Sequence, residues 1–136
     1  MVRVKFPHFT LEEAEVLEAF QKKFTSFFNW QYDVRLKSKK FELADIKEPT
    51  LRLMWKALTA KRIDAVCEDG VFVNIIEVKR VMLSSGIGQL LVYGHMYEKQ
   101  FKPGKPIRLW LIAKYPDPDV EEVANNLGIK TWSMVK

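Results

Sequence analysis

Cysteine is nearly absent from this sequence, which contains only Cys67. A single cysteine excludes an internal disulfide and a cysteine-based zinc or iron–sulfur site. Uninterrupted apolar runs are a few residues long, as at Leu90–Tyr93, whereas a membrane span needs about 20 residues. Acidic residues follow soon after the N-terminus, and no small-residue cleavage site is present. We therefore expect no signal peptide, no membrane contact and a cytoplasmic protein.

Glycine and proline are also scarce, with six of each in 136 residues, which excludes collagen-like and low-complexity chains. Hydrophobic residues make up 48% of the sequence, enough to bury a core. The length fits one domain, and no repeat or linker composition divides the chain. We therefore interpret residues 1–136 as a single domain.

Positive charge is concentrated in the first half of the chain. Residues 1–62 hold 13 Lys/Arg and 8 Asp/Glu, a net charge of +5, whereas residues 63–136 hold 9 of each. Residues 35–62 alone contain 9 basic and 3 acidic residues. Such a stretch is typical of proteins that bind polyanions, although a solvated lysine-rich surface has the same composition.

An N-terminal helix is predicted to begin after Thr10, because Glu13 follows at the capping-box spacing. Apolar residues then recur at helical spacing to about Phe28. Glu13 falls in the middle of this apolar arc, so its carboxylate is expected to point towards the core and to need a partner there. The capping box explains Glu13 equally well through the Thr10 backbone.

Alternation of apolar and polar residues predicts the first strand within Trp30–Lys37, and Asp69-Gly70 predicts the turn of a β-hairpin. The polar residues 38–49 are expected to form a loop and Leu51–Leu58 a short helix. The elements after the hairpin are expected to be a helix at Ser84–Gln100, a strand at 107–115, a helix at 118–127 capped by Gly128, and a last short strand at 129–135. The predicted fold class is therefore α/β, a central mixed sheet flanked by helices.

Two acidic residues, Asp64 and Glu77, lie inside the strand patterns of this hairpin, where burial should exclude them. If the hairpin closes at Asp69-Gly70, the numbers of cross-strand partners sum to 139, and Asp64 faces Ile75. Glu77 then lies diagonally from Asp64 on the same face, about 7–8 Å away at the backbone. Lys79 is two residues further along and projects from that face.

A divalent cation with oxygen ligands would relieve the repulsion between two such carboxylates. The alternative is a structural ion-pair cluster, in which Arg62 faces Glu77 and Lys79 neutralises the remaining charge. The residues taken singly leave both interpretations open.

The order R-I-D-A-V, hairpin, I-I-E-V-K resembles the PD-(D/E)XK nuclease superfamily, with Asp64, Glu77 and Lys79 at the motif positions. The resemblance covers residues 10–115 and implies a restriction-endonuclease-like core. The chain departs from the pattern at Ile63, which stands where many members have proline, and it lacks the cysteines of the iron–sulfur relatives.

The resemblance continues on the following helix, where Gln89 and Tyr93 have the Q-x-x-x-Y spacing of RecB-type members and share one helix face. Ordinary helix packing is the other explanation for this pair. Size and basicity are also similar to those of archaeal Holliday junction resolvases, which are not defined by Q-x-x-x-Y.

The resemblance implies a phosphodiesterase site that uses Mg²⁺ or Mn²⁺. Asp64 and Glu77 would bind the metal together with the backbone carbonyl of Val78. Glu13 would complete the ligand shell, directly or through water. Lys79 would orient or deprotonate the attacking water.

DNA is the partner that the resemblance implies. Gln89 would position the lysine or the scissile phosphate, and Tyr93 would contact the nucleic-acid backbone. Within the basic stretch, contacts to phosphates are expected of Lys37, Lys39, Lys40 and Arg62.

Other functions stay open at this stage. The fold would also suit a non-catalytic nucleic-acid-binding module or a ribonuclease, and the acidic pair would be structural in an unrelated small α/β protein. A homodimer is expected if two strands have to be cut. The sequence does not distinguish an endonuclease from an exonuclease.

Overall fold

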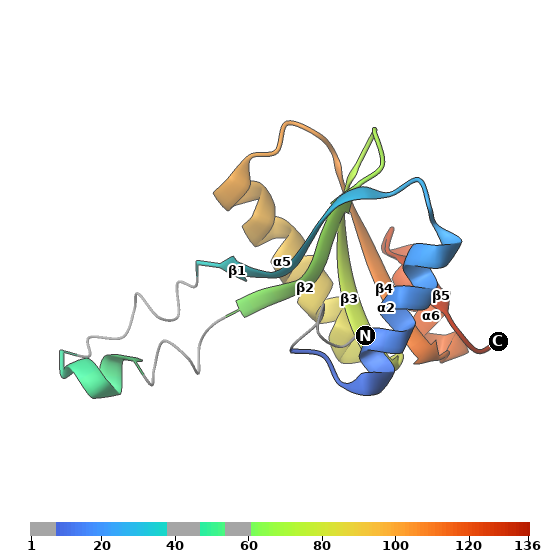
Figure 1. Cartoon of the computed structure of the whole chain (residues 1–136), viewed down its shortest axis with the longest axis horizontal. Helices are drawn as coiled ribbons and strands as arrows, with labels where there is room; N and C mark the ends of the chain where they lie inside the picture. Colours follow the sequence, from blue (N-terminus) through green and yellow to red (C-terminus); the bar gives the residue numbers. More distant parts are fainter. Residues whose placement is uncertain (1–7, 38–46, 54–60) are drawn as a thin grey trace.

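The computed structural model describes residues 8–37, 47–53 and 61–136. Strands in this part of the chain form one five-stranded sheet in the order β1-β2-β3-β4-β5 (Figure 1). Their bounds are β1 Phe28–Leu36, β2 Lys61–Glu68, β3 Val73–Val81, β4 Ile107–Tyr115 and β5 Lys130–Ser133. β1, β2 and β3 pair antiparallel, whereas β3, β4 and β5 run parallel. The predicted α/β fold with a central mixed sheet is confirmed.

Helices cover both faces of the sheet (Figure 1). α2 (Leu11–Lys23) packs on one face, and α5 (Ser84–Phe101) and α6 (Pro118–Asn126) pack on the other. α5 and α6 each connect two parallel strands, because such strands need a long crossover. Residues 49–53 are helical, and the rest of the predicted helix Leu51–Leu58 lies outside the described residues. No helix in the described ranges is long and apolar enough to cross a membrane.

The first helix is shorter than predicted. α2 ends at Lys23, and Phe24 is its C-cap with φ −108° and ψ 71°. Phe24 and Phe27 still pack on Phe20, with ring centroids 4.6 and 5.8 Å from its ring. The apolar periodicity towards Phe28 therefore reflected an aromatic cluster that continues through a turn, and not a longer helix.

A glycine brings α5 onto the sheet. A Cβ atom at Gly86 would lie 2.7 Å from Cδ1 of Leu111, which is fully buried in β4. Leu111 is buried together with Ile63, Ile75 and Leu90 between the sheet and the two helices. This close packing places the next turn of α5, which carries Gln89, over the strands.

The β2–β3 hairpin is confirmed, but its predicted register is wrong. The residue numbers of cross-strand partners, such as Ala65 and Ile76, sum to 141 instead of the predicted 139. The reason is a wider turn: the N–H of Asp69 donates to the carbonyl of Phe72 at 3.2 Å, so four residues form the turn. The same numbering places Asp64 opposite Glu77, where the ladder ends.

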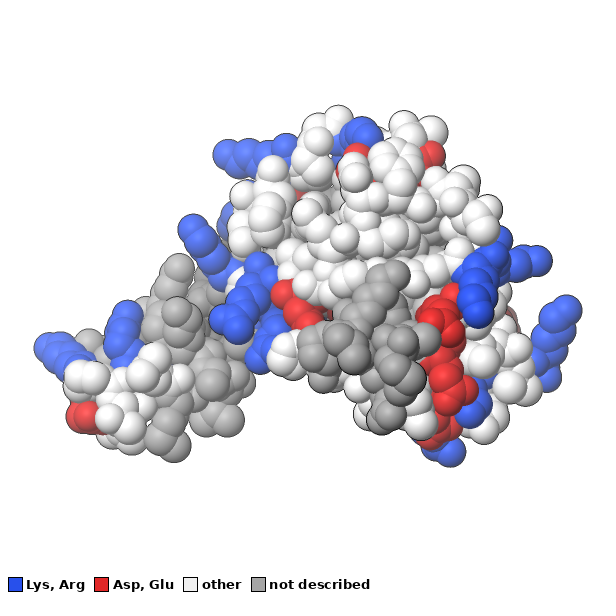
Figure 2. All heavy atoms as spheres, in the orientation of Figure 1, with Lys and Arg blue, Asp and Glu red and all other residues white. Residues whose placement is uncertain are grey.

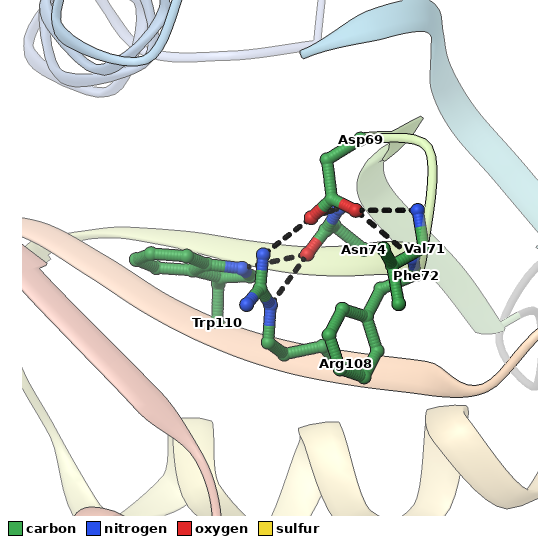
Figure 3. Close-up of polar contacts among 6 residues, drawn as sticks. All are labelled: Asp69, Val71, Phe72, Asn74, Arg108 and Trp110. Carbon is green, nitrogen blue, oxygen red and sulfur yellow. Dashed lines mark hydrogen bonds and ion pairs between the residues drawn. The ribbon is translucent and has the colours of Figure 1, made fainter. Parts of the chain in front are cut away.

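A buried polar network anchors this turn to β4 (Figure 3). The Asp69 carboxylate accepts hydrogen bonds from the Val71 and Phe72 amides, from the side-chain amide of Asn74 and from Arg108. Asn74, which is fully buried, accepts in turn from Arg108 at 3.0 Å and from the Trp110 indole at 2.9 Å. Because these polar groups satisfy one another, the network stabilises the hairpin and fixes its register.

Candidate functional site

In β2, the alternation of side chains between the two faces of the sheet is interrupted at Asp64. Ile63 packs in the cluster beneath α5 and α6, whereas Ala65 packs in the cluster beneath α2. β1 changes faces at the same level, at Asp33, which lies opposite Asp64 in the register and has a φ of 52°. Both strands therefore change faces at the same level. The β2–β3 pairing runs from Glu68 back to Ala65, and β2 separates from β3 on the N-terminal side of Ala65.

The side chain of Asp64 occupies the point where the two strands separate. Its Oδ2 accepts a hydrogen bond from the backbone N–H of Val78 at 2.8 Å. The carboxylate thus replaces a ladder hydrogen bond that β2 no longer supplies. Asp64 is thereby fixed beside the β3 segment that carries Glu77, through the N–H of Val78. Metal ligation by the Val78 carbonyl stays a prediction.

Glu77 is one of the two buried polar or charged residues of the described chain, with 4% of its surface exposed. Its Oε2 lies 3.4 Å from Nζ of Lys79, and 22% of the lysine side chain is exposed. Its Oε1 is buried and has no hydrogen-bond partner among the described residues. The structure therefore brings Asp64, Glu77 and Lys79 together and leaves one carboxylate oxygen unsatisfied.

The two carboxyl groups strongly perturb each other's ionisation. Burial raises the pKa of Glu77 to about 8, and the Asp64 charge raises it further against the lowering effect of Lys79. Burial likewise raises the pKa of Asp64 to about 6, although the Val78 N–H and the Lys79 charge lower it. A cation between the two carboxylates would reverse this penalty, because it favours the ionised forms.

Tyr93 of α5 lies near this pair, and Gln89 lies beside Tyr93. Burial raises the pKa of Tyr93, and the negative charges of Glu77 and Asp64 raise it as well, while the adjacent Gln89 side chain lowers it. The Oε1 atom of Gln89 is buried and has no partner in the described part. Gln89 and Tyr93 therefore lie side by side on α5 as their spacing predicts, with Tyr93 near the two carboxylates.

Glu13 is engaged first as a helix cap. Its Oε1 accepts from the Thr10 N–H at 3.0 Å, and Oγ1 of Thr10 accepts from the Glu13 N–H at 3.1 Å. Its charge nevertheless contributes to the raised pKa of Asp64, so it lies near the pair. The described residues contain no group of three His, Cys, Asp or Glu side chains arranged to hold a metal. Glu13 therefore does not form a three-carboxylate group with Asp64 and Glu77 in this part of the chain, and its role as a metal ligand stays a prediction.

Lys37 and Arg62 lie at the ends of β1 and β2 that extend away from the rest of the sheet, and Figure 2 shows Lys and Arg side chains gathered in this region. The backbone N–H of Lys37 donates to Oε1 of Gln100 on α5 at 2.8 Å, which fixes the end of β1. Arg62 lies opposite Arg35 in the β1–β2 register. The described ion-pair partner of Glu77 is Lys79 and not Arg62, so of the structural alternative only the part played by Lys79 is seen. Lys39 and Lys40 lie outside the described residues.

Sequence reasoning missed Asp33. Its carboxylate lies 3.6 Å from Nε2 of His8, and its left-handed backbone marks the twist. Only glycine, asparagine and aspartate adopt this conformation readily, so an aspartate inside a strand pattern was the available signal.

A cavity of about 390 Å³ lies at the hairpin end of the sheet, away from the carboxylate pair. Trp30 of β1, Tyr97 of α5 and Lys105 are among its lining residues, and none of the predicted catalytic residues borders it. Lys105 is paired with Glu68 at 2.6 Å, so the charged groups of this cavity are already satisfied.

Comparison with known proteins identifies the fold but not the family. No family model matches the chain, and no curated protein matches it. A crystal structure described as that of protein of unknown function AF1548 superposes with a TM-score of 0.51 and 14% identity, covering 90% of this chain. The chain corresponds to 57% of the length of that structure. What this likeness establishes is an α/β fold, a mixed sheet with helices packed on it.

Proposed function

We propose that the chain is a metal-dependent nuclease that hydrolyses DNA phosphodiester bonds with two carboxylates and a lysine. The observation that carries this proposal is the convergence of Asp64, Glu77 and Lys79 where β2 separates from β3, with Glu77 Oε1 buried and unpaired in the described structure. Two buried carboxyl groups at one site repel each other when both are ionised, and a cation between them relieves that cost. The resemblance of the same residues to the PD-(D/E)XK superfamily supports this function.

The residues present fit Mg²⁺ or Mn²⁺. Carboxylate and carbonyl oxygens are the ligands that Mg²⁺ prefers, and it retains several waters, so Asp64, Glu77 and the Val78 carbonyl suffice to hold it. When bound, the ion would lower the pKa of a coordinated water and polarise the phosphate.

The chain's own groups would do the remaining work. Lys79 lies beside Glu77 and would hold the attacking water and stabilise negative charge on the phosphorus centre. The free Oε1 of Gln89 is an acceptor that would orient the lysine ammonium or a water. Tyr93 would donate its hydroxyl to the nucleic-acid backbone.

One observation favours a second function, a nucleic-acid-binding module without catalysis. The described residues offer two carboxylates and no third ligand side chain, and Lys79 already neutralises part of their charge. A ribonuclease is the third possibility, and it would use the same groups. The predicted homodimer and cytoplasmic setting stay predictions.

A cleavage assay tests the proposal. The protein is incubated with branched, single-stranded and linear duplex DNA and with RNA, in Mg²⁺, Mn²⁺ or EDTA. We expect metal-dependent DNA cleavage that Glu77→Ala and Lys79→Ala abolish, while Glu121→Ala and Lys130→Ala retain it. Cleavage that survives EDTA or both site substitutions refutes the mechanism. Tight, salt-sensitive binding with intact substrates would instead identify the binding module.

A further inference from the structure

Two arginines lie directly opposite each other where β1 and β2 leave the sheet. Arg35 of β1 pairs with Arg62 of β2 in the ladder, and neighbours across an antiparallel pair project from the same face. Like charges in this position repel, so a ribbon that retains them is destabilised in the absence of an anion.

No carboxylate of the described chain neutralises these two guanidinium groups. The nearest acidic residues in the ribbon are already engaged, since Asp33 pairs with His8 at 3.6 Å and Asp64 accepts from the Val78 amide. Further positive charge stands beside the pair, because Lys61 and Lys37 flank it in sequence. Within the described structure the pair is thus a positively charged surface with no carboxylate partner.

The position of the pair relative to the carboxylates follows from strand geometry. Arg62 is two residues from Asp64 in β2, which at about 3.3 Å per residue is about 7 Å along the strand. The joint twist of β1 and β2 at Asp33 and Asp64 turns this part of the ribbon relative to the rest of the sheet. Val34 and Ile63, which neighbour the arginines in sequence, pack beneath α5 and α6, so Arg35 and Arg62 project from the opposite face of the ribbon.

We propose that Arg35 and Arg62 together form a clamp that binds one backbone phosphate of a nucleic acid. The planar guanidinium groups suit this role, because each can donate two parallel hydrogen bonds to phosphate oxygens. The clamp gives affinity and position but no sequence preference. Phosphate binding by this pair does not depend on the nuclease activity proposed above.

The test is DNA binding in EDTA, so that cleavage plays no part. Fluorescence anisotropy with a labelled single-stranded oligonucleotide and a labelled duplex is measured over a series of salt concentrations. We expect Arg35→Gln and Arg62→Gln each to weaken binding about tenfold and to reduce the salt slope by about 1. Because both arginines would hold one phosphate, the salt slope of the double variant should also fall by only about 1 in total. Lys130→Gln, at the far edge of the sheet, is the control for net charge.

Two results would overturn the clamp. One is a loss of DNA affinity no greater than that caused by Lys130→Gln. The other is a fall of about 2 in the salt slope of the double variant, which would mean that the two arginines bind separate phosphates. A thermal melt without ligand separates binding from structure: the variants should melt at the temperature of the wild type or higher, and a drop of several degrees would mean a structural pair. Failure of cleavage with the clamp intact would refute only the proposed nuclease.

Discussion

Glu77→Gln is the substitution that most sharply separates a metal site from a structural ion pair. In the metal-free protein the pKa of Glu77 is raised to about 8 by burial and by the Asp64 charge, from an ordinary value of 4.5. The folded state therefore binds the proton more tightly than the unfolded chain does. Stability from the neutral carboxyl is fully present below pH 4.5 and is lost as the pH rises through about 8.

The structure gives the size of this effect. Ionising Glu77 at pH 8 costs the folded protein up to about 5 kcal/mol, since a tenfold change in proton affinity is about 1.4 kcal/mol. Relaxation and water entry around a carboxylate with a lysine at 3.4 Å reduce the expected loss to about 2–3 kcal/mol. Glutamine keeps the shape without the charge, so the variant should be more stable than the wild type at pH 8 by that amount and equally stable near pH 4.5.

Urea unfolding in EDTA, followed by tryptophan fluorescence at pH 4.5, 6 and 8, measures this difference. The exposed Glu98→Gln on α5 is the matched control and should follow the wild type at every pH. Adding Mg²⁺ should stabilise the wild type most at pH 8 and leave Glu77→Gln nearly unchanged, because bound metal favours the ionised carboxylate. A Glu77→Gln protein that is less stable than the wild type at pH 8 would refute the reasoning and identify a structural pair with Lys79.

Four further substitutions test three separate parts of the account. Asp64→Asn keeps an acceptor for the Val78 amide and removes a buried charge, so apo stability in urea should be unchanged or higher, and a loss of several kcal/mol would support the structural ion-pair alternative. Glu13→Gln preserves the capping box, so stability should stay within about 0.5 kcal/mol while metal-dependent cleavage falls severalfold; an unchanged rate would leave Glu13 a cap alone. Gly86→Ala should lower the free energy of unfolding by about 1–2 kcal/mol, because the new Cβ presses on the side chain of buried Leu111. Gly88→Ala has nothing within 4 Å of its Cβ and should raise the free energy of unfolding by about 0.5–1 kcal/mol. Equal effects of the two substitutions would contradict the packing of α5.

Local patterns predicted most of the fold. Helix α5 and strand β4 lie where periodicity and turn residues placed them, and Gly128 adopts the positive φ of 81° expected after a helix end. Helix α2 was extended too far because Phe24 and Phe27 keep the apolar spacing after the helical backbone has ended. Periodicity reports which side chains are buried, and here a turn buries them as well as a helix would.

The candidate site was predictable in its residues but not in its geometry. An acidic residue inside a strand pattern identified Asp64 and Glu77, because burial of a carboxylate demands a reason. Their direct opposition depends on a turn that the Asp69 side chain widens to four residues, and a two-residue turn signal does not contain that information. The pairing of Arg35 with Arg62 depends on the register between distant strands, which local sequence does not specify.

The most direct test of the central claim is a crystal structure of the wild type grown with Mn²⁺, with its anomalous signal recorded. We expect an ion about 2.0–2.2 Å from one oxygen each of Asp64 and Glu77, with Lys79 beside the bound water. The account would be contradicted by a saturating Mn²⁺ concentration that leaves no ion between these carboxylates, or by carboxylates that point to opposite sides of the sheet.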